Sequence, residues 1–397
     1  MTEIPGGAHD PLDGVTDRVA DRMADRVTDR AIDAVVDDVR AAAYRVPTDR
    51  PEADGTFAWD ATTLVVAEIS AGEVTGTGWT YAPAAAAPFL ERTLAPVVTG
   101  AAALDIPGIW RAMVRRVRNA GRQGIAGYAI SAVDVALWDL KARLLGVPLV
   151  RLFGATGDRV PVYGSGGFTT YDDDTTAAQL RHWVHDQGIP RVKIKIGESW
   201  GTEPLRDLHR VALARKVIGP DAELYVDANG GYTAKQAVRL ERRMRDHDVR
   251  WFEEPVSSDD LAGLRLVRER SEADVAAGEY GGDQVYFTRM CAAGAVDCLQ
   301  IDATRCGGYT GWFAAAAVAA GHNLQVSAHC APNLHLPAAA ATPGLRHVEW
   351  FHDHARIETE LFDGAADPAG GGLRPGADVP GLGLTLRHDA AERHRVA

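Results

Sequence analysis

The sequence predicts an α/β protein in which a parallel β/α barrel follows a small α+β domain. Two patterns lead to this prediction. From residue 160 onward, short runs rich in β-branched and other apolar residues alternate with amphipathic helical stretches, at a repeat of about 25 residues. Before residue 145, strand-like runs are followed by helical patterns, an order typical of an α+β unit. A chain of 397 residues has room for both parts.

The composition is that of a globular protein and excludes several function classes. The chain has 54 Asp and Glu against 42 Lys and Arg, and this net charge of −12 argues against nucleic acid or an anionic membrane surface as a partner. No apolar run reaches the length of a membrane span, and the N-terminus lacks the basic and apolar regions of a secretory signal. The cysteines have no C-x-x-C spacing, which fits reduced thiols in a cytoplasmic protein; they are Cys291, Cys298, Cys306 and Cys330.

Residues 1–33 are predicted to form a separate N-terminal extension. Apolar residues recur at every fourth position from Val15 to Ala31 with Asp-Arg pairs between them, which favours a solvated surface helix over a partner-binding one. Residues 34–155 then form the α+β domain. Its strands are expected at 39–41 and 63–68, joined by a polar loop at 47–55, and its helical patterns continue to about residue 145.

Residues 156–355 carry the barrel pattern. A doubly wound open sheet is the competing fold, but the Gly-rich turn with which such a sheet binds a dinucleotide is missing after the first strand. The expected strands are 160–163, 192–196, 224–226, 249–252, 275–277, 298–301, 324–327 and 347–350, with helices such as 177–187, 204–218 and 234–247 between them.

An ionisable side chain stands at the end of each strand from the second to the eighth. The C-terminal ends of barrel strands meet at one mouth, where barrel enzymes place their chemistry, so these side chains are expected to form one site. They are Lys195, Asp227, Glu253, Glu279, Asp302, His329 and Glu349.

Three of these residues form a candidate metal site. Asp227, Glu253 and Glu279 are 26 residues apart, one β/α unit each, which places three carboxylates on neighbouring strands. Such anions repel one another unless a cation neutralises them or they take up protons. Oxygen ligands without His or Cys select a hard ion, and Mg²⁺ fits best, with salt bridges to Lys or Arg as the alternative. Glu254 is expected to point to the opposite side by strand alternation, either as a residue that supports the ligands or as a structural one.

Two lysines and a histidine are candidate acid–base groups. Lys193 and Lys195 face the same side of one strand, and burial lowers the pKa of a lysine toward that of a competent proton abstractor. His329 and Asp302 end adjacent strands, so the carboxylate can orient the imidazole. Glu349 can pair with a substrate carboxylate oxygen when it is protonated, or with Lys193 when it is ionised. Together these groups suit removal of a proton α to a carboxylate, provided that the developing enediolate charge is stabilised.

This constellation resembles the enolase superfamily and, within it, the mandelate racemase subgroup. The K-x-K motif of the family matches Lys193-Ile194-Lys195, and its metal ligands match Asp227, Glu253 and Glu279. Its dyad matches Asp302 and His329, and its electrophilic or carboxylate-binding glutamate matches Glu349. Residues 132–140 resemble the segment that leads from the capping domain into the barrel. The resemblance implies a (β/α)₇β modified TIM barrel, capped by the α+β domain that residues 356–397 complete. It also implies that Asn229 contacts substrate near the metal. We further expect a homo-oligomer.

The resemblance implies a small-molecule carboxylate as substrate and three readings of the function. A β-hydroxyl on the substrate leads to dehydration to a 2-keto-3-deoxy acid, so an Mg²⁺-dependent acid-sugar dehydratase is expected first. Without that hydroxyl, proton exchange between the two faces gives a racemase or epimerase. A barrel that binds metal and ligand without turnover is the third reading.

Residues outside the strand ends are expected to shape specificity. A capping loop at about 46–60 contains Asp49, Arg50, Glu52, Asp54 and Trp59, and its polarity suits an acid sugar unless these charges merely face solvent. Arg305 follows the sixth strand and can reach a distal substrate oxygen or bridge to a carboxylate. His352-Asp353-His354 is not expected to bind a second metal, because adjacent loop residues rarely converge without further ligands.

Overall fold

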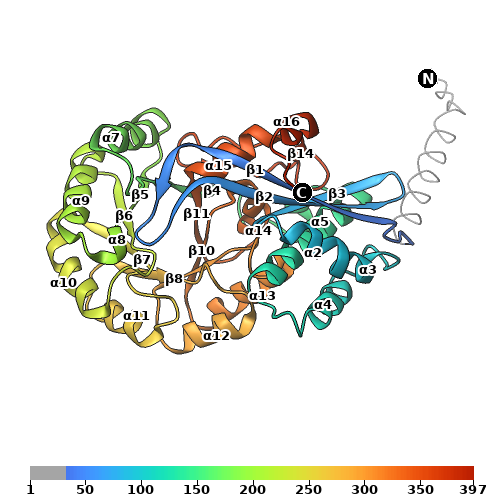
Figure 1. Ribbon diagram of the computed structural model, residues 1–397, viewed down its shortest axis with the longest axis horizontal. Coiled ribbons are helices and arrows are strands. Elements are labelled where there is room, and N and C mark those ends of the chain that lie inside the picture. The colour runs from blue at the N-terminus through green and yellow to red at the C-terminus, as the bar shows by residue number, and fades with distance from the viewer. Residues whose placement is uncertain (1–32) are drawn as a thin grey trace, which may run out of the picture.

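The computed structural model describes residues 33–397, so the predicted extension lies outside it apart from Asp33. Figure 1 shows a long hairpin that runs from a helical layer across one end of a closed barrel. No helix in the described part of the chain is both long and apolar enough to cross a membrane.

The hairpin belongs to a three-stranded antiparallel sheet. It comprises β1 (Asp38–Ala53), β2 (Ala58–Ala71) and β3 (Val74–Tyr81), in that order. The predicted polar loop at 47–55 was wrong, because β1 continues through most of it: pairing is irregular after Pro47 and resumes with Glu52 opposite Trp59. The true turn is short, and Asp54 closes it by accepting hydrogen bonds from the backbone N–H groups of Thr56 at 2.6 Å and Phe57 at 2.8 Å.

A helical layer covers one face of this sheet. Its elements are α2 (Ala86–Phe89), the π-helix η1 (Leu90–Leu94), α3 (Ala95–Val98), α4 (Ile106–Arg116), α5 (Ile125–Leu144) and α6 (Leu149–Phe153). Helix α5 packs most closely, and glycines on β3 permit this: a Cβ at Gly78 would lie 2.3 Å from the carbonyl oxygen of Ala132. The approach buries nearly the whole of α5, which connects the sheet to the barrel.

Two buried aspartates of α5 make those connections. Asp134 accepts hydrogen bonds from the Thr310 backbone N–H (2.9 Å) and hydroxyl (2.6 Å) in the first turn of a barrel helix. Asp139 accepts from the backbone N–H of Thr77 on β3 (2.8 Å) and of Leu382 in the C-terminal segment (2.6 Å). One helix thus joins three parts of the chain through fully buried carboxyl groups.

We predict that Asp134→Ala lowers the free energy of unfolding by about 1–3 kcal/mol at pH 5, since it leaves the partly buried Thr310 N–H unpaired. Burial raises the pKa of Asp134 to about 7 from 3.8. A carboxyl group whose folded pKa is raised stabilises the fold below its unfolded pKa, and this contribution is lost as pH rises through the folded value. The difference between wild type and variant should therefore shrink from pH 5 to pH 8 in urea titrations. A difference that grows with pH would contradict this assignment.

Eight parallel strands close into the barrel. Each is hydrogen bonded to the next, from β4 through β11, and β11 pairs with β4, which excludes the open doubly wound sheet. The eight predicted strands are confirmed, with ends shifted by up to three residues. They are β4 (Val160–Gly166), β5 (Arg191–Lys195), β6 (Glu223–Asp227), β7 (Val249–Glu253), β8 (Asp274–Ala277), β9 (Cys298–Ile301), β10 (Gln325–Ala328) and β11 (Leu345–Phe351).

Helices follow every strand and form the outer layer of the barrel (Figure 1). After β4 to β7 they are α7 (Asp173–Arg181) with η2 (His182–Asp186), α8 (Glu198–Gly201) with α9 (Pro204–Ile218), α10 (Ala234–Met244) with η3 (Arg245–His247), and α11 (Leu261–Arg268). After β8 to β11 they are α12 (Gln284–Ala292), α13 (Gly308–Gly321), α14 (Pro332–Ala340) and α15 (His352–Leu361). The resulting fold is the predicted modified TIM barrel with an N-terminal capping domain.

The C-terminal segment returns to the capping sheet. It contains β12 (Phe362–Asp363), β13 (Gly372–Leu373), β14 (Thr385–Leu386) and α16 (His388–Glu392). The Ala43 N–H on β1 donates to the carbonyl oxygen of Ala397 (2.9 Å), and the Arg45 N–H donates to that of His394 (2.8 Å). That residues 356–397 complete the capping domain, with divisions at 155 and 355, stays a prediction.

Candidate active site

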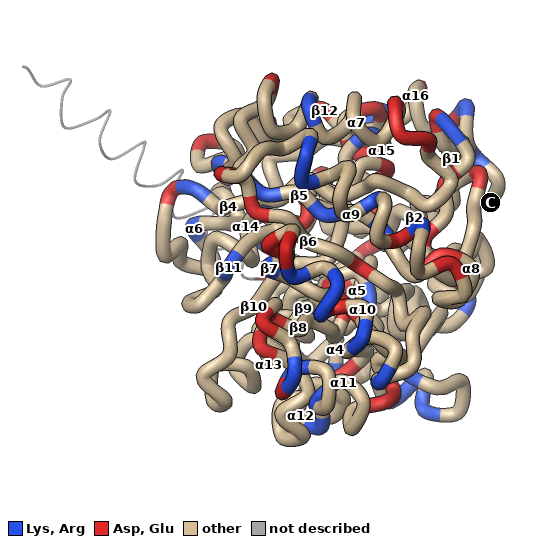
Figure 2. The backbone as a smooth tube through the Cα atoms, turned by 90° about the vertical axis from the view of Figure 1, so that its left-hand side faces the viewer, with Lys and Arg blue, Asp and Glu red and all other residues tan. Residues whose placement is uncertain are grey.

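The predicted strand-end residues lie together at the mouth of the barrel. The set is Lys193, Lys195, Asp227, Glu253, Glu279, Asp302, His329 and Glu349, and every member is buried. Figure 2 shows basic and acidic segments of the barrel strands next to one another near the middle of the molecule. Buried charges of both signs at one mouth require mutual pairing, and each has a partner here.

The three predicted metal ligands converge. Asp227, Glu253 and Glu279 each offer one carboxylate oxygen, and these atoms lie within 4.8 Å of one another. Burial, followed by repulsion from Asp227, raises the pKa of Glu253 to about 8. Oε2 of Glu279 is buried and accepts no hydrogen bond among residues 33–397, although Nε2 of His329 lies 3.3 Å away. Three buried oxygens at this spacing fit a hard divalent cation.

The two lysines are held by these carboxylates. Nζ of Lys195 lies 2.5 Å from Oδ2 of Asp227, and Nζ of Lys193 contacts Glu253 and lies 2.8 Å from Oε1 of Glu349. Burial alone would lower the pKa of Lys195, but Asp227 and the other nearby carboxylates raise it above the ordinary value. The prediction that burial lowers the pKa of the lysines left out these anions, and a cation held by Asp227 and Glu253 would offset their effect on Lys195.

His329 and Asp302 form the predicted pair. Nδ1 of His329 lies 2.9 Å from Oδ2 of Asp302, and Nε2 lies 3.3 Å from Oε2 of Glu279. Burial opposes ionisation, but the hydrogen bond to His329 and the charge of Arg305 hold the pKa of Asp302 well below its ordinary value. An ionised carboxylate at Nδ1 fixes the imidazole with Nε2 toward the mouth.

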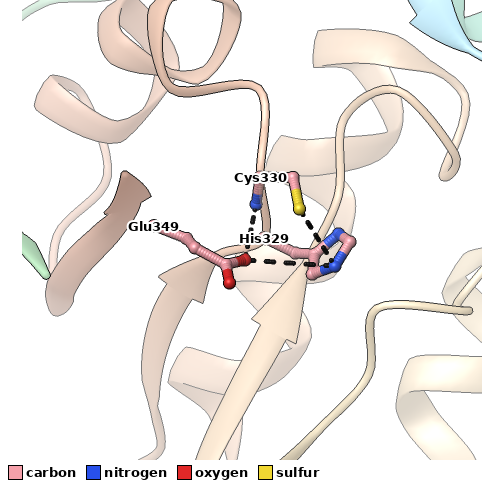
Figure 3. Close-up of side chains that lie close together, drawn as sticks. All are labelled: His329, Cys330 and Glu349. Atoms are coloured by element: carbon pink, nitrogen blue, oxygen red, sulfur yellow. Dashed lines mark hydrogen bonds and ion pairs between the residues drawn. The ribbon is translucent and has the colours of Figure 1, made fainter. Parts of the chain in front are cut away.

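Cys330 connects the histidine to Glu349 (Figure 3). Its backbone N–H donates to Oε2 of Glu349 at 2.8 Å, and its Sγ lies 3.3 Å from Nε2 of His329. The second oxygen of Glu349 accepts from the Ser165 hydroxyl at 2.6 Å as well as facing Lys193. Glu349 thus pairs with Lys193 in its ionised form. Burial opposes ionisation, but the charges of Lys193 and His329 hold the pKa of Glu349 well below its ordinary value.

Comparison with known proteins agrees with this geometry. The family model described as "Mandelate racemase / muconate lactonizing enzyme, N-terminal domain" matches residues 31–154, and "Enolase C-terminal domain-like" matches residues 175–390. The chain belongs to the mandelate racemase subgroup of the enolase superfamily. Both its domains and its closed barrel are those of this subgroup.

Relatives of known activity in this superfamily have several chemistries. A 3,6-anhydro-alpha-L-galactonate cycloisomerase of Streptomyces coelicolor is 33% identical, over 90% of this chain and 99% of its own. The L-talarate/galactarate dehydratase of Salmonella typhimurium is 31% identical, over 82% of this chain and 81% of its own. Its structure with Mg and L-lyxarohydroxamate has a TM-score of 0.83 at 26% identity, covering 92% of this chain and 93% of the other.

A solved structure from Rubrobacter xylanophilus is more similar still. This mandelate racemase/muconate lactonizing enzyme-like protein is 46% identical, with a TM-score of 0.88, over 91% of this chain and 100% of its own. The comparisons therefore fix the superfamily and subgroup and support an enzyme, while the relatives divide between dehydratases and isomerases.

The predicted substrate contacts differ in their placement. Arg305 takes the bridging alternative: its Nη1 lies 3.2 Å from Oε1 of Glu279 and its Nε 3.4 Å from Oδ2 of Asp302. The Asn229 N–H donates to Oδ1 of Asp227 at 2.9 Å, and its own Oδ1 is buried without a partner among the described residues. Trp59 packs on Phe168 with ring centroids 5.5 Å apart, in the cluster that includes Cys330.

Glu254 follows the ligand Glu253 in a backbone conformation that strand alternation does not describe. Its φ of 35° places it in the left-handed region, so the alternation of a regular strand does not apply. The side chain is buried, and burial together with the charges of Glu279 and Asp227 raises its pKa well above the ordinary value. Glu254 is thus close enough to the carboxylates to feel their charge, which fits the expectation of a residue that supports the ligands.

His335 is a further residue that was not predicted, although a lone histidine in the apolar run 334–341 was a signal. It is fully buried on α14. Its Nε2 accepts from the Ala303 N–H at 2.8 Å, and its Nδ1 lies 3.0 Å from the carbonyl oxygens of Cys330 and Ala331. One neutral imidazole thereby connects the chain after Asp302 to the chain after His329.

We predict that His335→Ala lowers kcat about 10–100-fold with little change in KM, because the dyad loses its support while substrate contacts remain. Steady-state kinetics on the true substrate measures this split. His335→Asn, which can restore the donor at Nδ1, should recover part of kcat, and exposed His322→Ala is the matched control. If His335→Ala and His335→Asn lose the same amount of kcat as each other and the same amount of melting temperature, the role of His335 is purely structural.

Proposed function

We propose that this chain is an Mg²⁺-dependent acid-sugar dehydratase. The observation that carries the proposal is the presence, at one buried mouth, of three converging carboxylates with Lys195 and a His329–Asp302 pair. Lys195 ends β5 and His329 follows β10, with β4 and β11 between them around the barrel. The dehydratase names among its relatives support the same choice.

Each side chain has a role in this proposal. Asp227, Glu253 and Glu279 would hold the ion. When bound, Mg²⁺ supplies positive charge that binds the substrate carboxylate and stabilises negative charge developing on it. Lys195 removes the α-proton, with Lys193 and Glu349 beside the carboxylate. Asn229 and Trp59 are proposed to line the substrate site, and Arg305 is proposed to hold Glu279 and Asp302 in place.

His329 completes the elimination. Its imidazolium, oriented by Asp302, donates a proton to the β-hydroxyl, which leaves as water when the C–O bond breaks. The resulting enol becomes a 2-keto-3-deoxy acid by taking a proton at the β-carbon. Two bases at one mouth also permit proton exchange without loss of water. An isomerase of the same acids is therefore the second candidate, which the cycloisomerase relative favours.

The proposal is tested by a screen of mono- and diacid sugars with Mg²⁺. Semicarbazide detects a 2-keto acid, and proton NMR in heavy water detects exchange at the α-carbon. Release of a 2-keto acid supports the dehydratase, and exchange without it supports the isomerase. If acids bind but none shows α-proton exchange or turnover, the third alternative is favoured, a barrel that binds metal and ligand without catalysis. We also propose that the protein is a cytoplasmic homo-oligomer. Size-exclusion chromatography with light scattering measures the number of chains per particle.

A further inference from the structure

A second group of potential ligands lies where the capping hairpin meets the barrel. Asp49 and Glu52 belong to β1, and His352 is the first residue of α15. One ligand atom from each lies within 4.8 Å of the other two. Figure 1 shows β1 crossing the barrel close to α15. None of the three residues belongs to the carboxylate set described above.

The histidine and the aspartate are already arranged like two ligands of one ion. Nε2 of His352 lies 3.3 Å from Oδ1 and 3.2 Å from Oδ2 of Asp49. Two ligand atoms of a tetrahedral zinc ion are separated by about 3.4 Å. An ion pair between the two residues would explain the same distance, so this contact alone does not indicate a metal.

Glu52 provides the independent observation. Its side chain is fully buried, and only Oε2 has a donor, the indole N–H of Trp59 at 2.9 Å. Oε1 is buried without a hydrogen-bond partner among residues 33–397. Burial, followed by repulsion from Asp353, raises the pKa of Glu52 to about 8. An uncompensated buried carboxylate oxygen is costly unless a cation or proton meets it.

The neighbouring arginine does not supply that cation. Nη2 of Arg356 lies 2.5 Å from Oδ1 of Asp353 and donates to the carbonyl oxygen of Pro47 at 2.8 Å. Asp353 also accepts from the hydroxyl of Thr62. His352 faces Asp49, and within residues 33–397 no Lys, Arg or His forms an ion pair with Glu52.

We propose that Asp49, Glu52 and His352 bind a divalent transition-metal ion of the Zn²⁺ type. One imidazole nitrogen with two carboxylate oxygens favours such an ion over Mg²⁺. Three protein ligands leave a position for water, as the partial exposure of Asp49 and His352 allows. The ion would tie β1 to the start of α15 and hold the hairpin over the barrel. His354, the other histidine of this segment, instead stacks on Tyr81 with ring centroids 3.4 Å apart.

Zn²⁺ titration of the full chain in excess Mg²⁺ tests the proposal. Calorimetry should give one Zn²⁺ fewer per chain, or an affinity about 100-fold weaker, for His352→Ala and Glu52→Gln than for wild type. Asp49→Asn, at an exposed residue, should also weaken the affinity for Zn²⁺. Co²⁺ in place of Zn²⁺ should give visible absorption bands that His352→Ala loses. The matched control is His209→Ala, because His209 pairs with Asp173 at 2.8 Å without belonging to a three-ligand group.

Wild-type stoichiometry and affinity in His352→Ala, Glu52→Gln and Asp49→Asn would overturn the proposal. So would an equal loss in His209→Ala. Melting curves in EDTA identify any variant that fails to fold. If the buried Glu52→Gln fails to fold, the Zn²⁺ binding of Asp49→Asn and His352→Ala decides whether the site exists. Because binding is measured without substrate, the outcome is independent of whether the barrel mouth is a dehydratase.

Discussion

Lys195→Met is expected to lower kcat by about three orders of magnitude, because a general base contributes about 10²–10⁴-fold and methionine keeps the length of the side chain without its amine. Exchange of the α-proton in heavy water should fall by a similar factor. His329→Asn should lower water elimination as strongly. If Lys195 is the abstracting base, this second variant retains exchange at the α-carbon.

The comparison of the two variants identifies the abstracting group. Exchange lost in Lys195→Met and kept in His329→Asn assigns abstraction to the lysine, and the reverse pattern assigns it to the histidine. Exposed Lys216→Met on α9 is the control for removing a lysine charge. Full activity in both Lys195→Met and His329→Asn would refute the proposed mechanism.

Glu279→Gln is expected to remove most of the stabilisation that Mg²⁺ gives the protein. A ligand at 100 times its Kd stabilises the folded state by about 2.7 kcal/mol, and loss of one of three charged ligands should abolish most of this gain. Activity at a fixed Mg²⁺ concentration should fall about 100-fold or more. Melting temperatures with and without Mg²⁺ measure the first effect, and kinetics after EDTA treatment and Mg²⁺ addition measures the second.

Glu272→Gln is the matched control for this prediction, because Glu272 is an exposed glutamate of the barrel that pairs with Arg245. It should keep both the Mg²⁺-dependent shift and the activity. An unchanged shift in Glu279→Gln would show that the three carboxylates do not form the Mg²⁺ site.

The barrel could be predicted from the sequence because its signals are local and repeated. Each strand is a short apolar run, and the polar residue that follows it recurs at the spacing of one β/α unit, as with Asp227, Glu253 and Glu279. Convergence at one mouth then follows from strand direction alone. For the same reason, the pairing of His329 with Asp302 was expected from adjacent strand ends.

The remaining features depend on long-range contacts or on backbone conformation. Proline-containing residues 47–52 belong to β1 because β2 and the barrel lie beside them, which a local pattern does not reveal. Glu254 leaves the alternation of a strand through a positive φ. The pKa of Lys195 is set by carboxylates from other strands. Asp49 and His352 are 303 residues apart in the chain and meet only in the fold.

The return of the chain's last residues to β1 has a consequence for self-association. Strand β1 lies at the edge of its sheet, and on its outer side Tyr44 pairs with Arg395 while Ala43 binds Ala397. Open strand edges are templates for pairing between molecules. Truncation after residue 393 would remove these partners, and we expect it to promote aggregation through the uncovered edge. An affinity tag placed ahead of the capping sheet would leave this edge covered.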